Sequence, residues 1–262
     1  MKYQFHTLAL SLLLGVAQTA QAADTVSPSY TTLFVDDVKH ELTAPARWQQ
    51  QQWQEFGWAT LAVVGTAVIV DRPLRDEMRR HSGNSRFMRD IERFGAQYSL
   101  GVLGGFFVAG TLGDNDKALA VAQDGLTASI IASGIVTPAI KFVAGRSRPI
   151  QNAGVYHFRP FSGNASFPSG HTTQAFALAS VISSHYDQTW IKCTSYSVAG
   201  LVGLARSYHQ AHFASDVVAG ALVGTLVGQS VVNYNQQRRA GKVALLPDTS
   251  SGGIGLRLAG NF

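Results

Sequence analysis

The sequence predicts an all-α protein built around a bundle of six helices. Six apolar stretches are each long enough for a helix: 53–71, 97–112, 117–144, 171–186, 190–207 and 212–234. None of them alternates apolar and polar residues with the period of two that indicates a half-buried strand. Hydrophobic residues make up 46% of the 262 residues and charged residues 14%, whereas soluble domains carry about 25% charged residues. This composition excludes an intrinsically disordered chain, because such chains need high charge and few apolar residues.

The N-terminal segment 1–22 has the pattern of a secretory signal peptide. Lys2 provides a positive charge, the apolar run 8–17 follows, and small residues at positions 20 and 22 fit a cleavage site. The apolar run is shorter than the roughly 20 residues that a membrane span needs. We therefore expect cleavage after Ala22 and export, to the periplasm in a Gram-negative cell; an uncleaved anchor helix is the alternative.

The rest of the chain divides into three parts. Residues 23–52 are polar and predict an irregular N-terminal extension or a short capping element, and residues 53–236 form the helical domain. Residues 237–262 form a C-terminal tail, in which an alternating segment around Leu256 predicts a short strand. Within the domain, 72–95 is amphipathic and carries seven arginines, which predicts a helical segment with a solvated face.

Charge and cysteine content narrow the class of partner. The formal net charge of +5 suits anionic partners. No run of lysine and arginine is interleaved with aromatic residues, so a nucleic-acid partner is not expected. The single cysteine, Cys193, excludes an intramolecular disulfide and any CxxC metal or redox motif.

The sequence Pro168-Ser169-Gly170-His171 leads into an apolar helical stretch. Proline and serine favour helix starts, and a helix N-terminus offers a phosphate unpaired backbone N–H groups and the positive end of the helix dipole. Gly170 has no side chain to hinder an oxyanion, and His171 lies in the first turn. Taken alone, the pattern also fits an ordinary helix cap with a surface histidine.

His212 and Asp216 are four residues apart, which would place both on one face of a helix. A carboxylate can hold one imidazole nitrogen as N–H and leave the lone pair of the other free to attack. A structural His–Asp pair is the alternative. Below this pair, Gly220, Gly224 and Gly228 repeat the spacing of four, which predicts close approach of a neighbouring helix.

Basic residues supply the charge that a phosphate would need. Lys141 offers a point charge, Arg148 and Arg206 offer planar forks for phosphate oxygens, and Arg146 is expected to face solvent. The chain runs away from His171 through one helix and returns through a second, and the last helix starts at the level where the second ends. The three clusters are therefore expected to converge at one end of the bundle.

In this order the clusters resemble the signature of the type 2 phosphatidic acid phosphatase superfamily, which includes bacterial class A acid phosphatases and vanadium haloperoxidases. That signature reads Lys-x6-Arg-Pro, then Pro-Ser-Gly-His, then Ser-Arg-x5-His-x3-Asp. The matching residues are Lys141, Arg148, Pro149, then Pro168 to His171, then Arg206, His212 and Asp216. Ala205 stands where the family has serine, which puts one supporting hydrogen bond in doubt.

The resemblance implies a role for each matched residue. His212 would be the nucleophile that forms a phosphohistidine, Asp216 would orient it, and His171 would protonate the leaving oxygen and later activate water. The phosphoryl oxygens would be held by Lys141, Arg148, Ser169, the Gly170 amide and Arg206. No metal or other cofactor is expected, because phosphoryl transfer depends mainly on positioning and on neutralising the equatorial oxygens, and three cationic side chains can do this.

We therefore expect a phosphatase of phosphomonoesters or diphosphates, with lipid-linked substrates, that acts outside the cytoplasm. The alternatives are an integral inner-membrane lipid phosphatase, for example of undecaprenyl diphosphate or phosphatidylglycerophosphate, a vanadium-dependent haloperoxidase, a metallo-hydrolase with His171, His212 and Asp216 as ligands, and a non-catalytic binder of lipid head groups.

With a cleaved signal, six spanning helices would leave the site in the cytoplasm. A helix of about 16 residues also covers only about 24 Å of a ~30 Å hydrocarbon core, which favours a bundle that is soluble or docked on a membrane surface.

Overall fold

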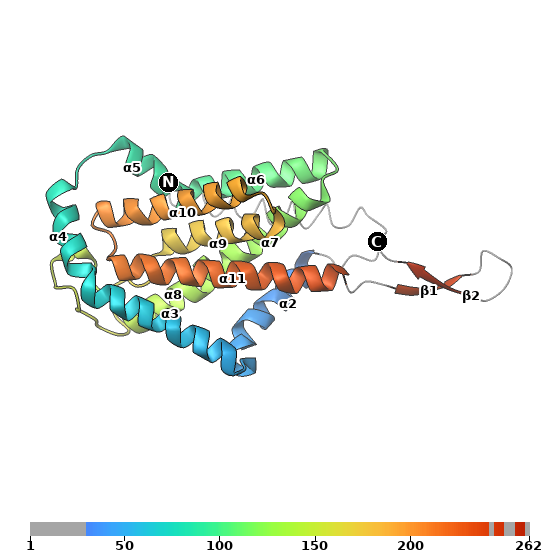
Figure 1. Cartoon of the computed structure of the whole chain (residues 1–262), viewed down its shortest axis with the longest axis horizontal. Coiled ribbons are helices and arrows are strands. Elements are labelled where there is room, and N and C mark those ends of the chain that lie inside the picture. Colours follow the sequence, from blue (N-terminus) through green and yellow to red (C-terminus); the bar gives the residue numbers. More distant parts are fainter. Residues whose placement is uncertain (1–29, 241–243, 249–254, 260–262) are drawn as a thin grey trace.

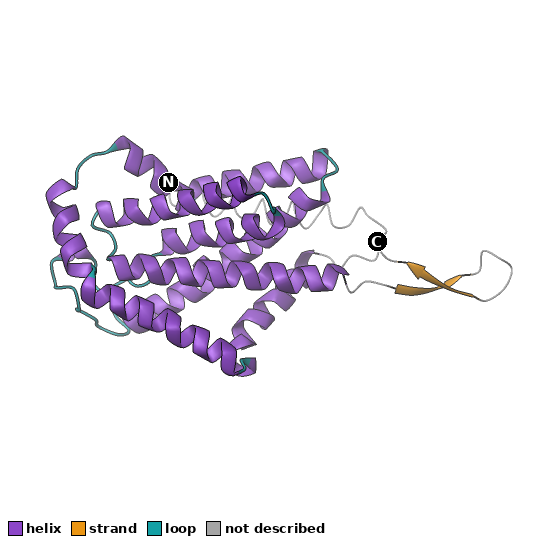
Figure 2. Ribbon diagram, in the orientation of Figure 1, coloured by secondary structure: helices purple, strands orange, loops and turns teal. Residues whose placement is uncertain are grey.

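The computed structural model describes residues 30–240, 244–248 and 255–259, and the main body of this part is helical (Figure 1). Its α-helices are α2 (Tyr30–Thr43), α3 (Gln50–Ile69), α4 (Asp71–His81), α5 (Arg86–Glu92), α6 (Gln97–Leu112), α7 (Asp116–Ser129), α8 (Thr137–Ala144), α9 (Gly170–His185), α10 (Thr189–Tyr208) and α11 (Ala214–Ala240). Two short strands, β1 (Ala244–Asp248) and β2 (Gly255–Ala259), pair antiparallel beyond the bundle (Figure 2).

The all-α prediction is confirmed, and each of the six predicted stretches is helical. α4 and α5 form the amphipathic segment that the arginines indicated. β2 contains Leu256 and Leu258 of the predicted alternating segment, and the first residue of that segment, Ile254, lies outside the described residues. The prediction of an irregular extension over 23–52 is wrong for α2. This helix buries only Tyr30, Leu33 and Asp37, which is too few apolar positions to produce a helical pattern in the sequence. The predicted signal peptide 1–22 lies outside the described residues.

α9 forms the centre of the bundle and packs against α7, α10 and α11. Its small residues make this possible: Ala177 and Val181 are fully buried and belong to the largest apolar cluster, together with Val231 and Val232 of α11. A second apolar cluster around Leu103 and Leu178 buries Tyr30 and fixes α2 to the bundle. The core therefore surrounds the helix that begins with the predicted phosphate-binding turn.

The predicted glycine stripe is the contact between α11 and α9. A Cβ on Gly220 would lie 2.6 Å from the carbonyl oxygen of Ser169, and one on Gly228 would lie 2.8 Å from that of Ala177. Gly224 faces the carbonyl of Thr173 at still closer range. Since side chains at these three positions would collide with backbone, the stripe sets the distance between the two helices that carry the candidate site.

A buried polar cluster lies where α2, α7 and the later part of α11 meet. Asn235 donates its amide N–H groups to Asp37 and Asp124, both at 3.0 Å. Asp124 also accepts from Arg239, at 2.7 Å, and contacts His185 at 2.8 Å. These contacts tie the helices together at the opposite end from the candidate site.

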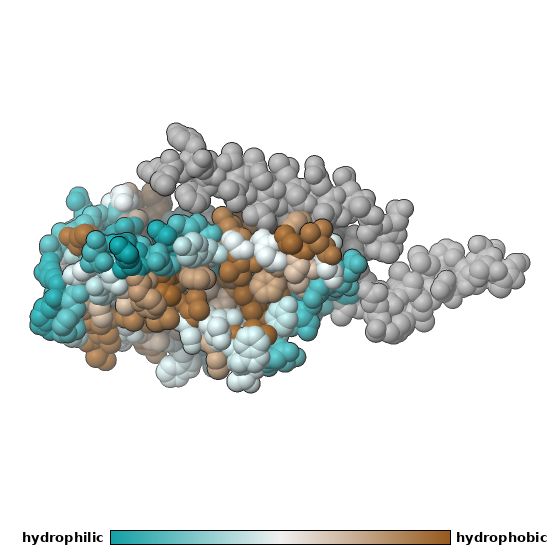
Figure 3. Space-filling model, turned by 90° about the horizontal axis from the view of Figure 1, so that it is seen from above, coloured by the Kyte–Doolittle hydropathy of each residue, from teal (hydrophilic) through white to brown (hydrophobic). Residues whose placement is uncertain are grey.

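Some of the described helices are long and apolar enough to cross a membrane. Two qualify on length and composition, Asp116–Ala144 and Ala214–Arg239, and the bent pair α3–α4 would add a third. Large apolar side chains stay exposed on the bundle, including Trp58 at 72% and Leu112 at 83%. Hydrophobic atoms gather along the middle of the molecule and hydrophilic atoms at the end that carries α4 and α5 (Figure 3).

Candidate active site

The residues that the sequence singles out lie at the end of the bundle where α8 and α10 end and α9 and α11 begin. α8 ends at Ala144 and is followed by Gly145, whose φ of +56° lies in the left-handed region. A Cβ added at this position would collide with the carbonyl of Arg159. The loop that follows is held by backbone hydrogen bonds, among them Ser166 N–H to the Arg146 carbonyl at 2.9 Å. This turn brings the loop back across the starts of α9 and α11.

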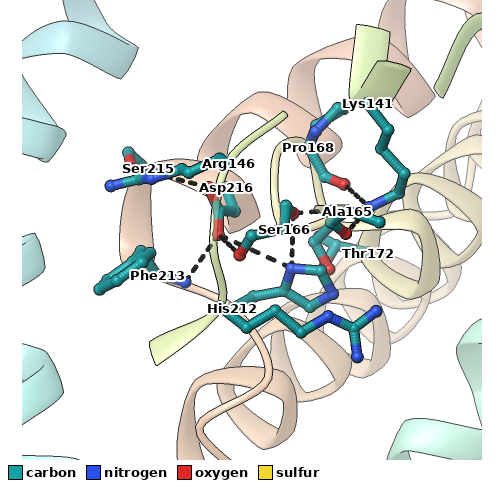
Figure 4. Close-up of polar contacts among 12 residues, drawn as sticks. Lys141, Arg146, Ala165, Ser166, Pro168, Thr172, His212, Phe213, Ser215 and Asp216 are labelled. Atoms are coloured by element: carbon teal, nitrogen blue, oxygen red, sulfur yellow. Dashed lines mark hydrogen bonds and ion pairs between the residues drawn. The ribbon is translucent and has the colours of Figure 1, made fainter. Parts of the chain in front are cut away.

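His212 lies in the turn before α11, so the prediction that it shares a helix with Asp216 is wrong (Figure 4). Its Nδ1 contacts the carbonyl oxygen of Ser166 at 2.7 Å, whereas Asp216 Oδ2 is 3.7 Å from Nδ1 and beyond hydrogen-bond distance. The same Oδ2 accepts from Ser166 Oγ at 2.6 Å and from the Phe213 N–H at 2.8 Å. Because a carbonyl only accepts, Nδ1 carries the proton and Nε2 keeps its lone pair.

Arg146 is buried, with 1% of its surface exposed, so the expectation that it faces solvent is wrong. Its guanidinium donates to Asp216 Oδ1 at 2.6 Å and to Asp71 Oδ2 at 2.7 Å, and it stacks over the Phe213 ring at 4.2 Å. Val155 accepts a further hydrogen bond through its carbonyl at 2.7 Å. Arg146 therefore compensates two buried carboxylates and holds the one that lies beside His212.

Arg206, in the last turn of α10, pairs with a carboxylate that the sequence analysis did not single out. Its Nη1 donates to Glu92 Oε2 at 2.7 Å, and His209 Nδ1 lies 2.8 Å from the same oxygen. Burial raises the pKa of Glu92, but hydrogen bonds from His209 and Arg206 outweigh it and hold the pKa below its usual value. Among the described residues the buried Nε of Arg206 has no partner, so one face of this guanidinium is available to a ligand.

Lys141 and Ser169 support the start of α9. Lys141 Nζ donates to the carbonyls of Ala165 at 2.6 Å and Pro168 at 2.5 Å. Ser169 is fully buried, and its Oγ accepts from Thr172 at 2.9 Å. α9 begins at Gly170, so its first backbone N–H groups have no acceptor within the helix. In this structure Lys141 is held by backbone oxygens, and it adds positive charge directly behind these N–H groups.

The two imidazoles are neutral at pH 7. Burial, followed by the positive charge of Arg206, lowers the pKa of His171 from its usual 6.5 to about 4. Burial also lowers the pKa of His212 to about 4, against the opposing effect of Asp216. Arg148 is half-buried, and burial and the charge of Arg206 lower its pKa. The positive charges of Arg206 and Arg148 and the neighbouring His212 all contribute to the lowered pKa of His171.

Acid is expected to destabilise the fold through these histidines. The pKa of His171 is about 4 in the folded protein, below the usual 6.5, so between these pH values the unfolded chain binds a proton that the folded protein does not. The free energy of unfolding therefore keeps its full value above pH 6.5 and decreases as the pH falls towards 4. The variant His171→Gln cannot titrate, so its Tm should fall less between pH 7 and about pH 4.5 than that of the wild type. Equal falls in Tm, measured by circular dichroism, would contradict this.

Two adjoining pockets lie on either side of His209, and one of them borders Arg206. One, of about 370 Å³, includes Arg89, Glu92, Arg206 and His209 in its wall. The other, of about 470 Å³, shares His209 and adds polar groups such as Tyr208. Within the described ranges, no three side chains of His, Cys, Asp or Glu are grouped so that they could hold a metal ion.

Comparison with known proteins shows a family resemblance over part of the chain. A family model described as the PAP2 superfamily matches residues 125–240, a segment that contains all three motif clusters in this geometry. This segment, less than half of the chain, is similar to the PAP2 superfamily. A lipid A 1-phosphatase of Porphyromonas gingivalis is 44% identical over 84 residues, which cover 30% of this chain and 19% of that protein. A lipid A 1-phosphatase of Rhizobium etli is 35% identical over 107 residues, covering 38% and 44% of the two chains.

A solved structure, that of Aquifex aeolicus LpxE, is 26% identical, has a TM-score of 0.46, and aligns with 61% of this chain and 94% of its own. The matched part of this chain spans less than half the length of either curated relative. The likeness to these relatives therefore covers only part of each protein.

Several residues that build this candidate site gave no usable signal in the sequence. Ser166 holds His212 through a backbone carbonyl, which any residue type could supply. Asp71 reaches Arg146 from 75 positions upstream. Glu92 lies in the arginine-rich segment, whose mixed charges indicated a solvated helical face. The high number of arginines around it is the one sequence feature that could have pointed to a functional role for this carboxylate. All three act through contacts between distant segments.

Proposed function

We propose that this protein is a metal-independent phosphatase that hydrolyses lipid-linked phosphomonoesters or diphosphates through a phosphohistidine on His212. The observation that carries the proposal is the Nδ1–H of His212 on the Ser166 carbonyl at 2.7 Å, which leaves Nε2 as a buried nucleophile. Curated relatives named lipid A 1-phosphatase and lipid phosphate phosphatase support a phosphorylated lipid as substrate.

In the first step the Nε2 lone pair attacks phosphorus, and the bond from phosphorus to the leaving oxygen breaks. Arg206, Arg148 and the N–H groups at the start of α9 neutralise the three equatorial oxygens. His171 gives its proton to the leaving oxygen, so the alcohol departs neutral. Burial keeps His171 uncharged in this structure, but a bound phosphate dianion favours the imidazolium form, because an opposite charge within a few ångströms raises a histidine pKa.

In the second step water attacks the phosphohistidine. The neutral His171 now accepts a proton from that water, the phosphorus–nitrogen bond breaks, and its electron pair returns to Nε2. Free phosphate leaves, and both histidines regain their starting states. Asp216 lies 3.7 Å from the ring and carries the charge that stabilises the phosphorylated, cationic imidazole.

The proposal is tested with purified protein and a panel of phosphatidate, lipid A and undecaprenyl diphosphate. We expect release of inorganic phosphate from at least one lipid, unchanged by EDTA, and inhibition by vanadate, which imitates the trigonal-bipyramidal transition state. Loss of activity with EDTA would replace this mechanism with a metal-dependent one. Halide oxidation that requires added vanadate would favour the haloperoxidase alternative.

We also propose that the enzyme works in association with a membrane outside the cytoplasm. The exposed apolar side chains of α3, among them Trp58, Leu61 and Ile69, support this because a water-facing helix rarely leaves so many uncovered. The signal-peptide pattern of residues 1–22 supports export. In cell fractionation we expect the protein in the membrane pellet after a high-salt wash, and accessible from the periplasmic side to added protease; recovery in the soluble fraction would contradict the association.

A further inference from the structure

The two pockets that share His209 carry more positive charge than one phosphate requires. Their walls contain the guanidinium groups of Arg79, Arg89 and Arg206, and Glu92 is the only carboxylate in the described lining. Glu92 is already paired with Arg206 and His209. Within the described chain, neither Arg79 nor Arg89 forms an ion pair or a side-chain hydrogen bond, so both charges are available to an anionic ligand.

The nearer pocket adjoins the start of α9, which carries His171, the residue expected to protonate the leaving oxygen. Glu92 and Arg206 line this pocket, and the turn that follows Glu92 packs against the His171 backbone. The pocket is held in place from two directions. Gly95, which follows α5, packs against the backbone of His171, and Gly83 lies against the hydroxyl of Tyr208, to which a Cβ would come within 3.3 Å.

The size of the space fits a polar group and not a lipid tail. A volume of about 370 Å³ equals that of roughly twelve water molecules in the liquid, enough for a sugar that bears a phosphate. Its lining is polar or charged apart from Gly83 and Ala211. Exposed apolar side chains such as Trp58 and Leu61 lie on α3 and are not part of this lining.

We infer that this pocket is a head-group subsite that binds a second anionic group, a phosphate or carboxylate, carried on the leaving-group side of the same substrate molecule, with Arg89 as its principal contact. The inference rests on the proposed phosphatase function, because it takes His171 to mark the leaving-group side. The favoured substrate is therefore a polar lipid head group with two anionic sites, and a lipid with a single phosphate uses only part of the site.

The test compares a lipid A that carries both phosphates with one that carries only the phosphate that the enzyme removes. For Arg89→Ala, the ratio of kcat/KM for the doubly phosphorylated lipid to that for the singly phosphorylated lipid should fall about tenfold or more, the usual effect of losing one charge-assisted hydrogen bond. Arg89→Lys should recover part of the ratio. Arg86→Ala removes an exposed arginine of the same helix outside the pocket lining and should leave the ratio unchanged.

Binding gives a second readout that does not need turnover. In the His212→Ala background, adding Arg89→Ala should weaken binding of the doubly phosphorylated lipid, measured by calorimetry in detergent micelles, much more than binding of the singly phosphorylated lipid. Equal weakening for both lipids, or none for either, overturns the subsite. If the wild type binds both lipids with an Arg89-dependent preference but hydrolyses neither, the subsite stands and the proposed phosphatase function fails.

Discussion

Replacing His212 with alanine is expected to abolish turnover and the formation of a phosphoenzyme. The Nε2 of His212 is the nucleophile in the proposed reaction, and its ring is fixed by the Ser166 carbonyl at 2.7 Å. Without it the remaining cations can bind phosphate but cannot form a covalent intermediate. The expected loss in kcat is about 10⁴-fold or more, the scale seen when a catalytic nucleophile is removed. Steady-state phosphate release measures the first effect, and trapping with labelled substrate under an alkaline, denaturing quench measures the second, because phosphohistidine is hydrolysed in acid.

Two comparisons separate loss of chemistry from loss of fold. His81→Ala removes an exposed histidine of α4 that pairs only with Glu77, and it should keep wild-type turnover and labelling. Free imidazole added to His212→Ala should restore part of the turnover, because the vacated space can admit the same nucleophile. A His212→Ala protein with near-normal rates, or with undiminished labelling, would show that another residue receives the phosphoryl group.

The bundle could be predicted because burial leaves a direct trace in the chain. α6 and the continuous helix from α7 to α8 are apolar over almost their whole length, and their bounds agree closely with the predicted stretches. The glycine stripe was also predictable, since a spacing of four on a helix has few uses other than close packing. α2 was missed because it is held by a few contacts of Tyr30 and Leu33 and by polar bonds to Asp37, none of which produces a periodic pattern.

The candidate site could be predicted only as far as its motif. The motif contains the groups that would touch a phosphate, such as His171 and Arg206, but it does not contain what holds them. The support comes from Ser166, Asp71 and Glu92, whose contributions depend on tertiary contacts. Arg146 shows the limit most clearly: an arginine in a polar loop normally faces water, and only the two carboxylates that meet it in space make its burial favourable.

Replacing Arg146 with methionine is expected to cause the largest loss of stability among single substitutions at this site. The variant would leave Asp71 and Asp216 buried at 0% exposure without their shared cation. Removing one member of a buried ion network typically costs about 3–5 kcal/mol. Chemical unfolding in detergent should show this loss, and Arg80→Met, which breaks an exposed pair on α4, should change stability far less.

The double variant Asp71→Asn/Arg146→Met tests the electrostatic reason for that loss. It removes one buried negative charge together with the positive one, so the cluster regains its wild-type net charge, and part of the lost stability should return. Activity should stay low in the double variant, because Asp216 would still lack the guanidinium that holds Oδ1 at 2.6 Å and the carboxylate beside His212 would be free to turn. If the double variant is no more stable than Arg146→Met, then packing of the guanidinium against Phe213, and not charge compensation, is what Arg146 contributes to the fold.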